Sequence, residues 1–125
     1  MTGRPRYKGV DLPSLRIDEV TWSEAAAEHV RSRPERQTGQ PTLEPEWCTE
    51  AALDPRRVVR VAGSANPATA SLKVVGFSPS AFGRGDLLKV WLWSDDPLDE
   101  TWNGGSGAPA NDSDRRAYAK GVQNE

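Results

Sequence analysis

The sequence predicts an α+β domain, in which a small antiparallel sheet of three to four strands is backed on one face by two N-terminal helices and one C-terminal helix. Three runs rich in Val, Leu and aromatic residues follow one another, separated by Gly, Pro, Ser and Asn. Two segments of good helix formers precede these runs. A segment with capping residues at both ends follows them.

The two ends of the chain differ in composition from its middle. Residues 1–15 contain prolines and glycines without a hydrophobic period, so we expect a flexible N-terminal arm. A single domain is expected over residues 16–121, because 125 residues suffice for one modest core. Residues 122–125 are expected to form a disordered tail.

A short strand and a first helix are predicted after the arm. The apolar positions of residues 17–20 are typical of a strand. The Ala-rich and Glu-rich stretch that follows predicts a helix at about residues 23–33. Its cap is either Ser23 or a capping box made by Thr21 and Glu24.

A second, shorter helix is predicted to begin at Pro45, since proline suits the first helical position. Trp47, Ala51 and Leu53 then lie along one side, so we expect the helix to pack through its tryptophan. Asp54-Pro55 ends it, because the residue before a proline avoids the helical conformation.

The sheet is predicted as an antiparallel meander of residues 57–62, 72–77 and 87–93, with Trp102 as the candidate for a short fourth strand. Side chains alternate between the two faces of a strand. In the third run, one face therefore carries Leu88, Val90 and Leu92, and the other carries Lys89, Trp91 and Trp93.

The last helix is predicted over residues 112–120. Asn111 is a good N-cap, two aspartates place negative charge in the first turn, and Gly121 is a natural stop. The glycine-rich stretch before it, residues 104–107, predicts a turn leading into the helix.

The composition limits the classes of function. The formal net charge is −2, so attraction to nucleic acid has to come from a local patch of positive charge. Cys48 is the one cysteine, which excludes an internal disulfide and a cysteine metal cluster. No apolar run has the length of a signal peptide or a membrane span, so we expect a cytoplasmic protein that needs no membrane, metal or cofactor.

Four basic residues are the candidates to hold a phosphate group: Lys73, Lys89, Arg115 and Arg116. The simpler alternative for the two arginines is a helix face paired with nearby carboxylates. Trp91 and Trp93 together with Lys89 would form a stacking platform for single-stranded nucleic acid, flanked by positive charge. The simpler alternative here is a tryptophan in the core.

Four short motifs follow one another along residues 20–120: Trp22-Ser23-Glu24-Ala25 with His29; Glu46-Trp47 with Glu50-Ala51 and Asp54-Pro55; Val74-Val75-Gly76-Phe77-Ser78; and Asp114-Arg115-Arg116-Ala117-Tyr118. Their order and spacing resemble those of the BrnT-type toxins. These are small ribonucleases of type II toxin–antitoxin systems, related in fold to the RelE and ParE toxins.

The resemblance implies a metal-independent ribonuclease that inhibits translation, with RNA as its substrate and a cognate antitoxin protein as its partner. It implies that His29 and Asp114 transfer protons and that Arg115 and Arg116 bind phosphate, so that these four are the catalytic candidates. Lys73, Lys89 and Trp91 are the RNA-binding candidates. For His29, a partly buried or capping role is the simpler alternative.

One departure from the family pattern bears on catalysis. Ala108 and Pro109 stand where the family carries two adjacent arginines. Each preorganised donor of this kind stabilises the transition state by roughly 3 to 4 kcal/mol. The departure favours the alternative function, a catalytically inactive module of the toxin fold that binds a partner protein or nucleic acid.

Overall fold

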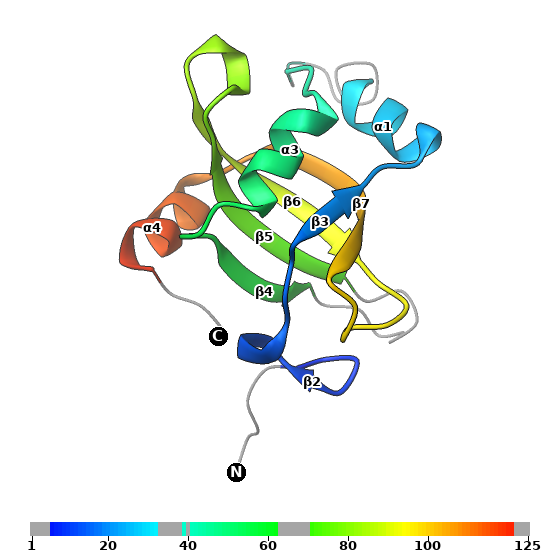
Figure 1. Cartoon of the computed structure of the whole chain (residues 1–125). Helices are drawn as coiled ribbons and strands as arrows, with labels where there is room; N and C mark the ends of the chain where they lie inside the picture. Colours follow the sequence, from blue (N-terminus) through cyan, green and yellow to red (C-terminus); the bar gives the residue numbers. More distant parts are fainter. Residues whose placement is uncertain (1–5, 33–38, 40, 63–70, 122–125) are drawn as a thin grey trace.

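The structure, a computed structural model, describes residues 6–32, 39, 41–62 and 71–121 (Figure 1). Its centre is a five-stranded sheet with the strand order β3-β7-β6-β5-β4. The strands of this sheet are β3 (Glu19–Thr21), β4 (Val58–Ala62), β5 (Ser71–Ser78), β6 (Asp86–Trp93) and β7 (Thr101–Pro109).

The α+β class is confirmed, but the sheet is larger than predicted and is mixed. Strands β4 to β7 form an antiparallel meander, as expected. Strand β3 adds to the free side of β7 and runs parallel to it, with Val20 opposite Trp102. The prediction of a purely antiparallel sheet of three to four strands is therefore wrong. No local pattern in the sequence indicates a pairing between strands that lie so far apart in the chain.

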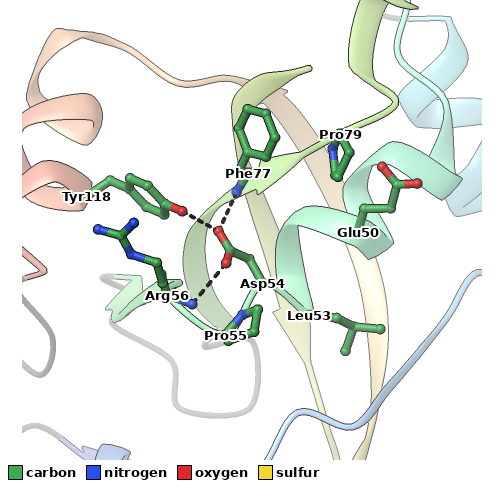
Figure 2. A pocket seen from close by; sticks show the side chains of 8 residues that line it. All are labelled: Glu50, Leu53, Asp54, Pro55, Arg56, Phe77, Pro79 and Tyr118. Atoms are coloured by element: carbon green, nitrogen blue, oxygen red, sulfur yellow. Dashed lines mark hydrogen bonds between the residues drawn. The ribbon is translucent and has the colours of Figure 1, made fainter. Parts of the chain in front are cut away.

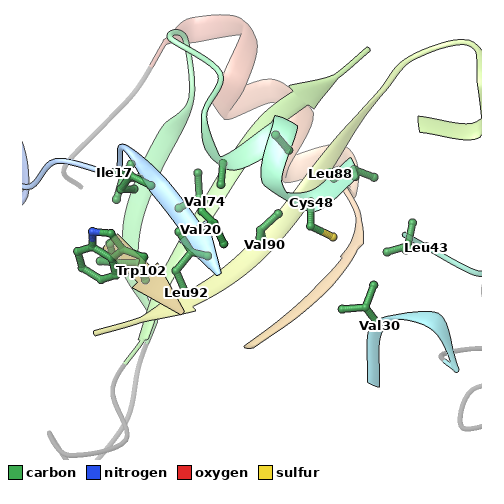
Figure 3. Packing of buried hydrophobic residues seen from close by; sticks show 14 of the residues in the cluster. Ile17, Val20, Val30, Leu43, Cys48, Val74, Leu88, Val90, Leu92 and Trp102 are labelled. Carbon is green, nitrogen blue, oxygen red and sulfur yellow. The ribbon is translucent and has the colours of Figure 1, made fainter. Parts of the chain in front are cut away.

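Two helices cover one face of the sheet, α1 (Glu24–Arg31) and α3 (Pro45–Ala52). Both were expected, and Ser23 caps α1 by accepting a hydrogen bond of 3.0 Å from the Ala26 amide. Pro45 occupies the first turn of α3, as predicted. Figure 3 shows the core between these helices and the sheet, which includes Val30, Leu43, Cys48, Val74, Leu88, Val90 and Leu92.

Two glycines let α3 lie close to the sheet. A Cβ at Gly76 would stand 1.9 Å from the Ala51 carbonyl oxygen, and a Cβ at Gly107 would stand 2.5 Å from the Cys48 sulfur. Gly107 belongs to β7, so the turn predicted at residues 104–107 is wrong. Glycine serves there for close packing instead of chain reversal. Burial raises the pKa of the Cys48 thiol to about 12, so this side chain packs as an apolar group.

Helix α4 (Asp112–Lys120) has the predicted bounds and caps. The Asn111 side chain accepts from the Asp114 amide, the Asp114 carboxylate accepts from the Asn111 amide, and Gly121 ends the helix at φ 69°. Its position differs from the prediction. Asp114 contacts Lys73 and Lys89, whose neighbours along the strands point to the core. Helix α4 therefore covers the face opposite α1 and α3, and the helices do not share one face.

Residues 6–15 differ from the loose arm expected there. They form a hairpin of β1 (Arg6–Tyr7) and β2 (Val10–Asp11), followed by a 3-10 helix, η1 (Leu12–Ser14). Tyr7 is fully buried, its ring centroid lies 5.2 Å from that of Trp102, and its hydroxyl donates to the Ser94 carbonyl at 3.2 Å. The aromatic contact and this hydrogen bond hold the segment on the domain. Residues 1–5 and the predicted tail at 122–125 lie outside the described residues.

The helices are short. The longest in the described parts of the chain, α4, has nine residues. None of the helices seen in those parts has both the length and the apolar character that crossing a membrane requires.

Candidate nucleic-acid interface

The sheet face on the α4 side carries all three predicted RNA-binding residues, Lys73, Lys89 and Trp91. The strand register places Arg60 opposite Lys73, Lys73 opposite Trp91, and Trp91 opposite Ser106, in one row across four strands. In the next row, Val75 lies opposite Lys89. Side chains opposite one another in a sheet are neighbours on the same face. We call the surface formed by Arg60, Lys73, Lys89, Trp91 and Trp93 the lysine–tryptophan face.

Two lysines of this face converge on one carboxylate from α4. The Lys73 ammonium lies 2.7 Å from Oδ1 of Asp114, and the Lys89 ammonium lies 3.8 Å from Oδ2. The Asp114 side chain is 3% exposed. Burial raises the pKa of this carboxyl, but hydrogen bonds from Lys73 and the Asn111 amide, with the charges of both lysines, lower it below its ordinary value. Asp114 is therefore ionised at neutral pH and anchors α4 to the sheet.

The aromatic part of the face is accessible. Trp93 is 43% exposed, and Trp91 is half-buried. The Lys89 ammonium lies 5.6 Å from the Trp91 ring centroid, within the range of a cation–π contact. Positive charge next to open indole rings is the arrangement on which the bases of a single strand stack while its phosphates meet the cations.

Arg115 of α4 pairs with a different carboxylate from the one that the two lysines contact. Arg115 donates through Nη2 to Oδ1 of Asp86 at 3.0 Å, at the beginning of β6. Arg116 is exposed on the outer side of the helix. Arg115 therefore fits the simpler alternative from the sequence, in which the arginines of this helix face pair with nearby carboxylates.

His29 is exposed on α1, on the other face of the sheet from Asp114. The structure does not bring these two predicted proton-transfer residues together. Sequence reasoning had no way to separate them, because the side of the sheet on which α4 packs depends on the whole topology. Arg60 was missed, although its place between Val59 and Val61 in a predicted strand already puts it on the face away from those valines.

A cavity of about 720 Å³ lies beside α4, where α3 ends and β5 extends beyond β4 (Figure 2). Asp54 stands at its centre. Its Oδ2 accepts from the Tyr118 hydroxyl at 2.5 Å and the Phe77 amide at 2.8 Å, and its Oδ1 accepts from the Arg56 amide at 2.9 Å. One carboxylate therefore joins the loop after α3 to β5 and to α4.

The same contacts shift two pKa values. Burial raises the pKa of Asp54, but the hydrogen bonds from Tyr118, Arg56 and Phe77 outweigh it and lower that pKa below its ordinary value. Burial and the hydrogen bond to Asp54 raise the pKa of Tyr118 to about 12. Tyr118 is therefore a neutral phenol that donates to an ionised partner, and the contact between these two residues was not predicted from the sequence.

Tyr118→Phe is expected to lower the free energy of unfolding by about 1.5 kcal/mol, because it removes one hydrogen bond to a charged acceptor and keeps the ring. Urea unfolding followed by circular dichroism measures the loss. When Asp54 is already replaced by Asn, Tyr118→Phe should lower the free energy of unfolding by clearly less. Equal costs in both backgrounds would mean that the hydrogen bond contributes nothing.

Within the residues that the structure describes, no three His, Cys, Asp or Glu side chains gather closely enough to hold a metal ion. Comparison with protein-family models gave no matching family, and comparison with curated proteins gave no matching sequence.

Proposed function

We propose that this chain is a BrnT-like toxin-fold protein of the cytoplasm that binds single-stranded RNA on the lysine–tryptophan face. The observation that carries the proposal is the row of Arg60, Lys73 and Trp91 with Lys89 beside it on one sheet face. Helix α4 covers part of this face, but the Lys73 and Lys89 side chains remain 25% and 19% exposed. The cations meet phosphates, and the indoles stack on bases without regard to sequence. The net charge of −2 is compatible with this, because the positive charge is local.

Binding without cleavage is the form of this proposal that the geometry supports best. His29 lies on the opposite face, and Asp114 is ionised between two lysines, so neither is placed to move a proton on the lysine–tryptophan face. Ala108 is in register with Lys89, and it stands where the resemblance would place an arginine. The face therefore lacks one cation at the position where charge would develop.

Trp91→Ala is expected to weaken the binding of an oligouridine by about tenfold, because stacking contributes roughly 1–3 kcal/mol per base. Fluorescence anisotropy of a labelled oligonucleotide measures this loss. Trp91→Phe keeps a stacking ring and should retain most of the affinity. Circular dichroism of both variants checks that the fold is intact.

The salt dependence provides a second readout of the same face. Lys89→Gln should reduce the slope of log Kd against log salt by about 0.7, the value for one phosphate contact on a single strand. Lys120→Gln, at the end of α4, serves as the matched control and should leave the slope unchanged. RNA binding that responds to none of these substitutions would overturn the proposal.

A ribonuclease toxin held by a cognate antitoxin is the second candidate. It is favoured by the Lys73 and Lys89 ammonium groups, which both lie near Asp114 and whose side chains remain 25% and 19% exposed, so that a phosphoryl group could approach them from solvent. Purified protein incubated with bulk RNA, and growth after induced expression, test it. Cleavage or growth arrest that is lost in Lys89→Ala would support this candidate. A pull-down with the product of the neighbouring gene tests the antitoxin.

A further inference from the structure

A smaller cavity lies between the segment that leads into β3 and the beginning of β4 (Figure 1). Its volume is about 180 Å³, below the roughly 300–1,000 Å³ of sites for drug-sized ligands, so it fits a ligand of only a few heavy atoms. Its apolar walls come from Leu12, Pro13, Leu15, Ile17, Pro55 and Val59. Three of these side chains belong to the core, so the walls are formed before any ligand arrives.

Arg57 is the one residue with a polar side chain among the described residues around this cavity. It directly precedes β4 and is half-buried. Its guanidinium makes one hydrogen bond to the described residues, a long one of 3.4 Å from Nη1 to the Asp54 carbonyl oxygen. A guanidinium carries five N–H donors in a planar fork. The edge formed by Nε and Nη2 therefore has two parallel donors for which no described residue is the acceptor.

Two carboxylates act on Arg57 without pairing with it. Burial lowers the pKa of Arg57, and the charges of Asp18 and Asp54 oppose this effect. Among the described residues, neither carboxylate forms an ion pair with the guanidinium. Asp18 accepts from Arg16 at 3.0 Å, and Asp54 holds the three segments described above. Arg57 is therefore a charged group that is partly removed from water and has no carboxylate partner in the part of the chain that the structure describes.

This combination of one guanidinium and aliphatic walls suits a carboxylate with a short alkyl chain. A guanidinium edge binds a carboxylate through two parallel hydrogen bonds, and such a pair is stronger where water is partly excluded. The aliphatic walls favour an alkyl chain over water. They disfavour a phosphate dianion, because its hydration would be lost against a single cation.

We infer that this cavity binds a short aliphatic monocarboxylate, with the carboxylate on Arg57 and the alkyl chain against Ile17 and Val59. The carboxylate can belong to a free acid of the size of butyrate or to the end of a peptide whose last side chain is aliphatic, because both present the same groups. The inference goes beyond the proposed function. None of the residues around this cavity belongs to the lysine–tryptophan face.

An NMR titration of the full chain with butyrate tests the inference. Butyrate is expected to bind at least about tenfold more tightly than butyramide, which has nearly the same shape but no charge. It should also bind about tenfold more tightly than acetate, because its additional methylenes leave water on binding. Inorganic phosphate should bind more weakly than butyrate.

Three variants connect the binding to the cavity, and circular dichroism checks that each is folded. Arg57→Gln removes the charge and should abolish the preference for butyrate over butyramide. Arg56→Gln is the matched control, because this neighbouring arginine lies outside the cavity, and it should leave that preference unchanged. Asp18→Asn removes a negative charge that acts on Arg57, so it should strengthen butyrate binding by about twofold.

N-acetyl-glycyl-valine and its C-terminal amide distinguish the two sources of the carboxylate. A preference for the acid over the amide that is lost in Arg57→Gln means that the end of a peptide is recognised. Binding of butyrate without binding of the peptide restricts the site to a free acid. Binding of the peptide without binding of butyrate restricts it to a chain end.

Trp91→Ala separates this site from the lysine–tryptophan face, because it should leave butyrate binding intact. The inference is overturned if butyrate and butyramide bind equally while the peptide acid and its amide also bind equally, or if neither butyrate nor the peptide binds. It is also overturned if Arg57→Gln and Arg56→Gln have the same effect, or if Asp18→Asn weakens binding. RNA binding that depends on Trp91 would survive each of these results.

Discussion

Gly76→Ala is expected to lower the free energy of unfolding by about 3 kcal/mol, near the upper end of the usual cost of overpacking. A Cβ at this position would lie 1.9 Å from the carbonyl oxygen of Ala51 and 2.8 Å from its carbonyl carbon. These are backbone atoms of α3, so the clash can be relieved only by moving the helix away from β5. Urea unfolding followed by tryptophan fluorescence measures the loss.

Gly105→Ala is the matched control for this experiment. It lies in β7 of the same sheet, and a Cβ there would meet the Trp91 carbonyl oxygen at 3.3 Å and Cδ1 of Trp93 at 3.7 Å. The 3.3 Å contact needs a shift of only a few tenths of an ångström, so we expect the loss in the free energy of unfolding to stay below about 1 kcal/mol. Equal losses in the two variants would show that the close approach of α3 to β5 is not the cause.

Asp114→Asn is expected to lower the free energy of unfolding by about 3 kcal/mol at neutral pH. The reason is that Lys73 and Lys89 lose the buried negative charge that both of them contact. Asparagine keeps an oxygen for the Asn111 amide, so the substitution tests the charge and largely spares the cap. Asp112→Asn is the control, since Asp112 is exposed in the same first turn. Its cost should be much smaller.

The pH dependence of this loss has a defined direction. The pKa of Asp114 is lower in the folded protein than in the unfolded chain, where it is about 3.9. The stability due to its charge is therefore complete above the unfolded value and is lost as the pH falls through the folded value. The unfolding free energies of wild type and Asp114→Asn should converge in acid. Curves that stay parallel down to that range would contradict the assignment of the stability to this charge.

The parts of the fold that were predicted correctly depend on local chemistry. Helix α4 begins and ends as expected, because Asn111 and Gly121 are specific signals for helix termini. The pairing of β3 with β7 and the placing of α4 on the far face depend on contacts between distant segments. Gly107 was misread because a glycine needed for close packing and a glycine needed for a turn look the same in a sequence.

The candidate interface was predictable in part, because the alternation of side chains along a strand is also a local property of the sequence. Alternation along β6 already placed Lys89 and Trp91 on one face, and the register of the neighbouring strand added Lys73. The separation of His29 from Asp114 follows from the topology, which the motifs alone do not contain. The Asp54 contacts were missed because they unite three segments whose proximity has no signal in any one of them.

The parallel pairing of β3 with β7 has a consequence for synthesis of the chain. During synthesis, β3 leaves the ribosome early, but its partner strand β7 emerges only after β4, β5 and β6. Until then, β3 and the exposed edge of β6 both lack the hydrogen-bonding partner that the finished sheet provides. Contacts of such long range form slowly. We therefore expect a nascent chain stopped before Thr101 to remain sensitive to proteases, and resistance to appear only when β7 has left the exit tunnel.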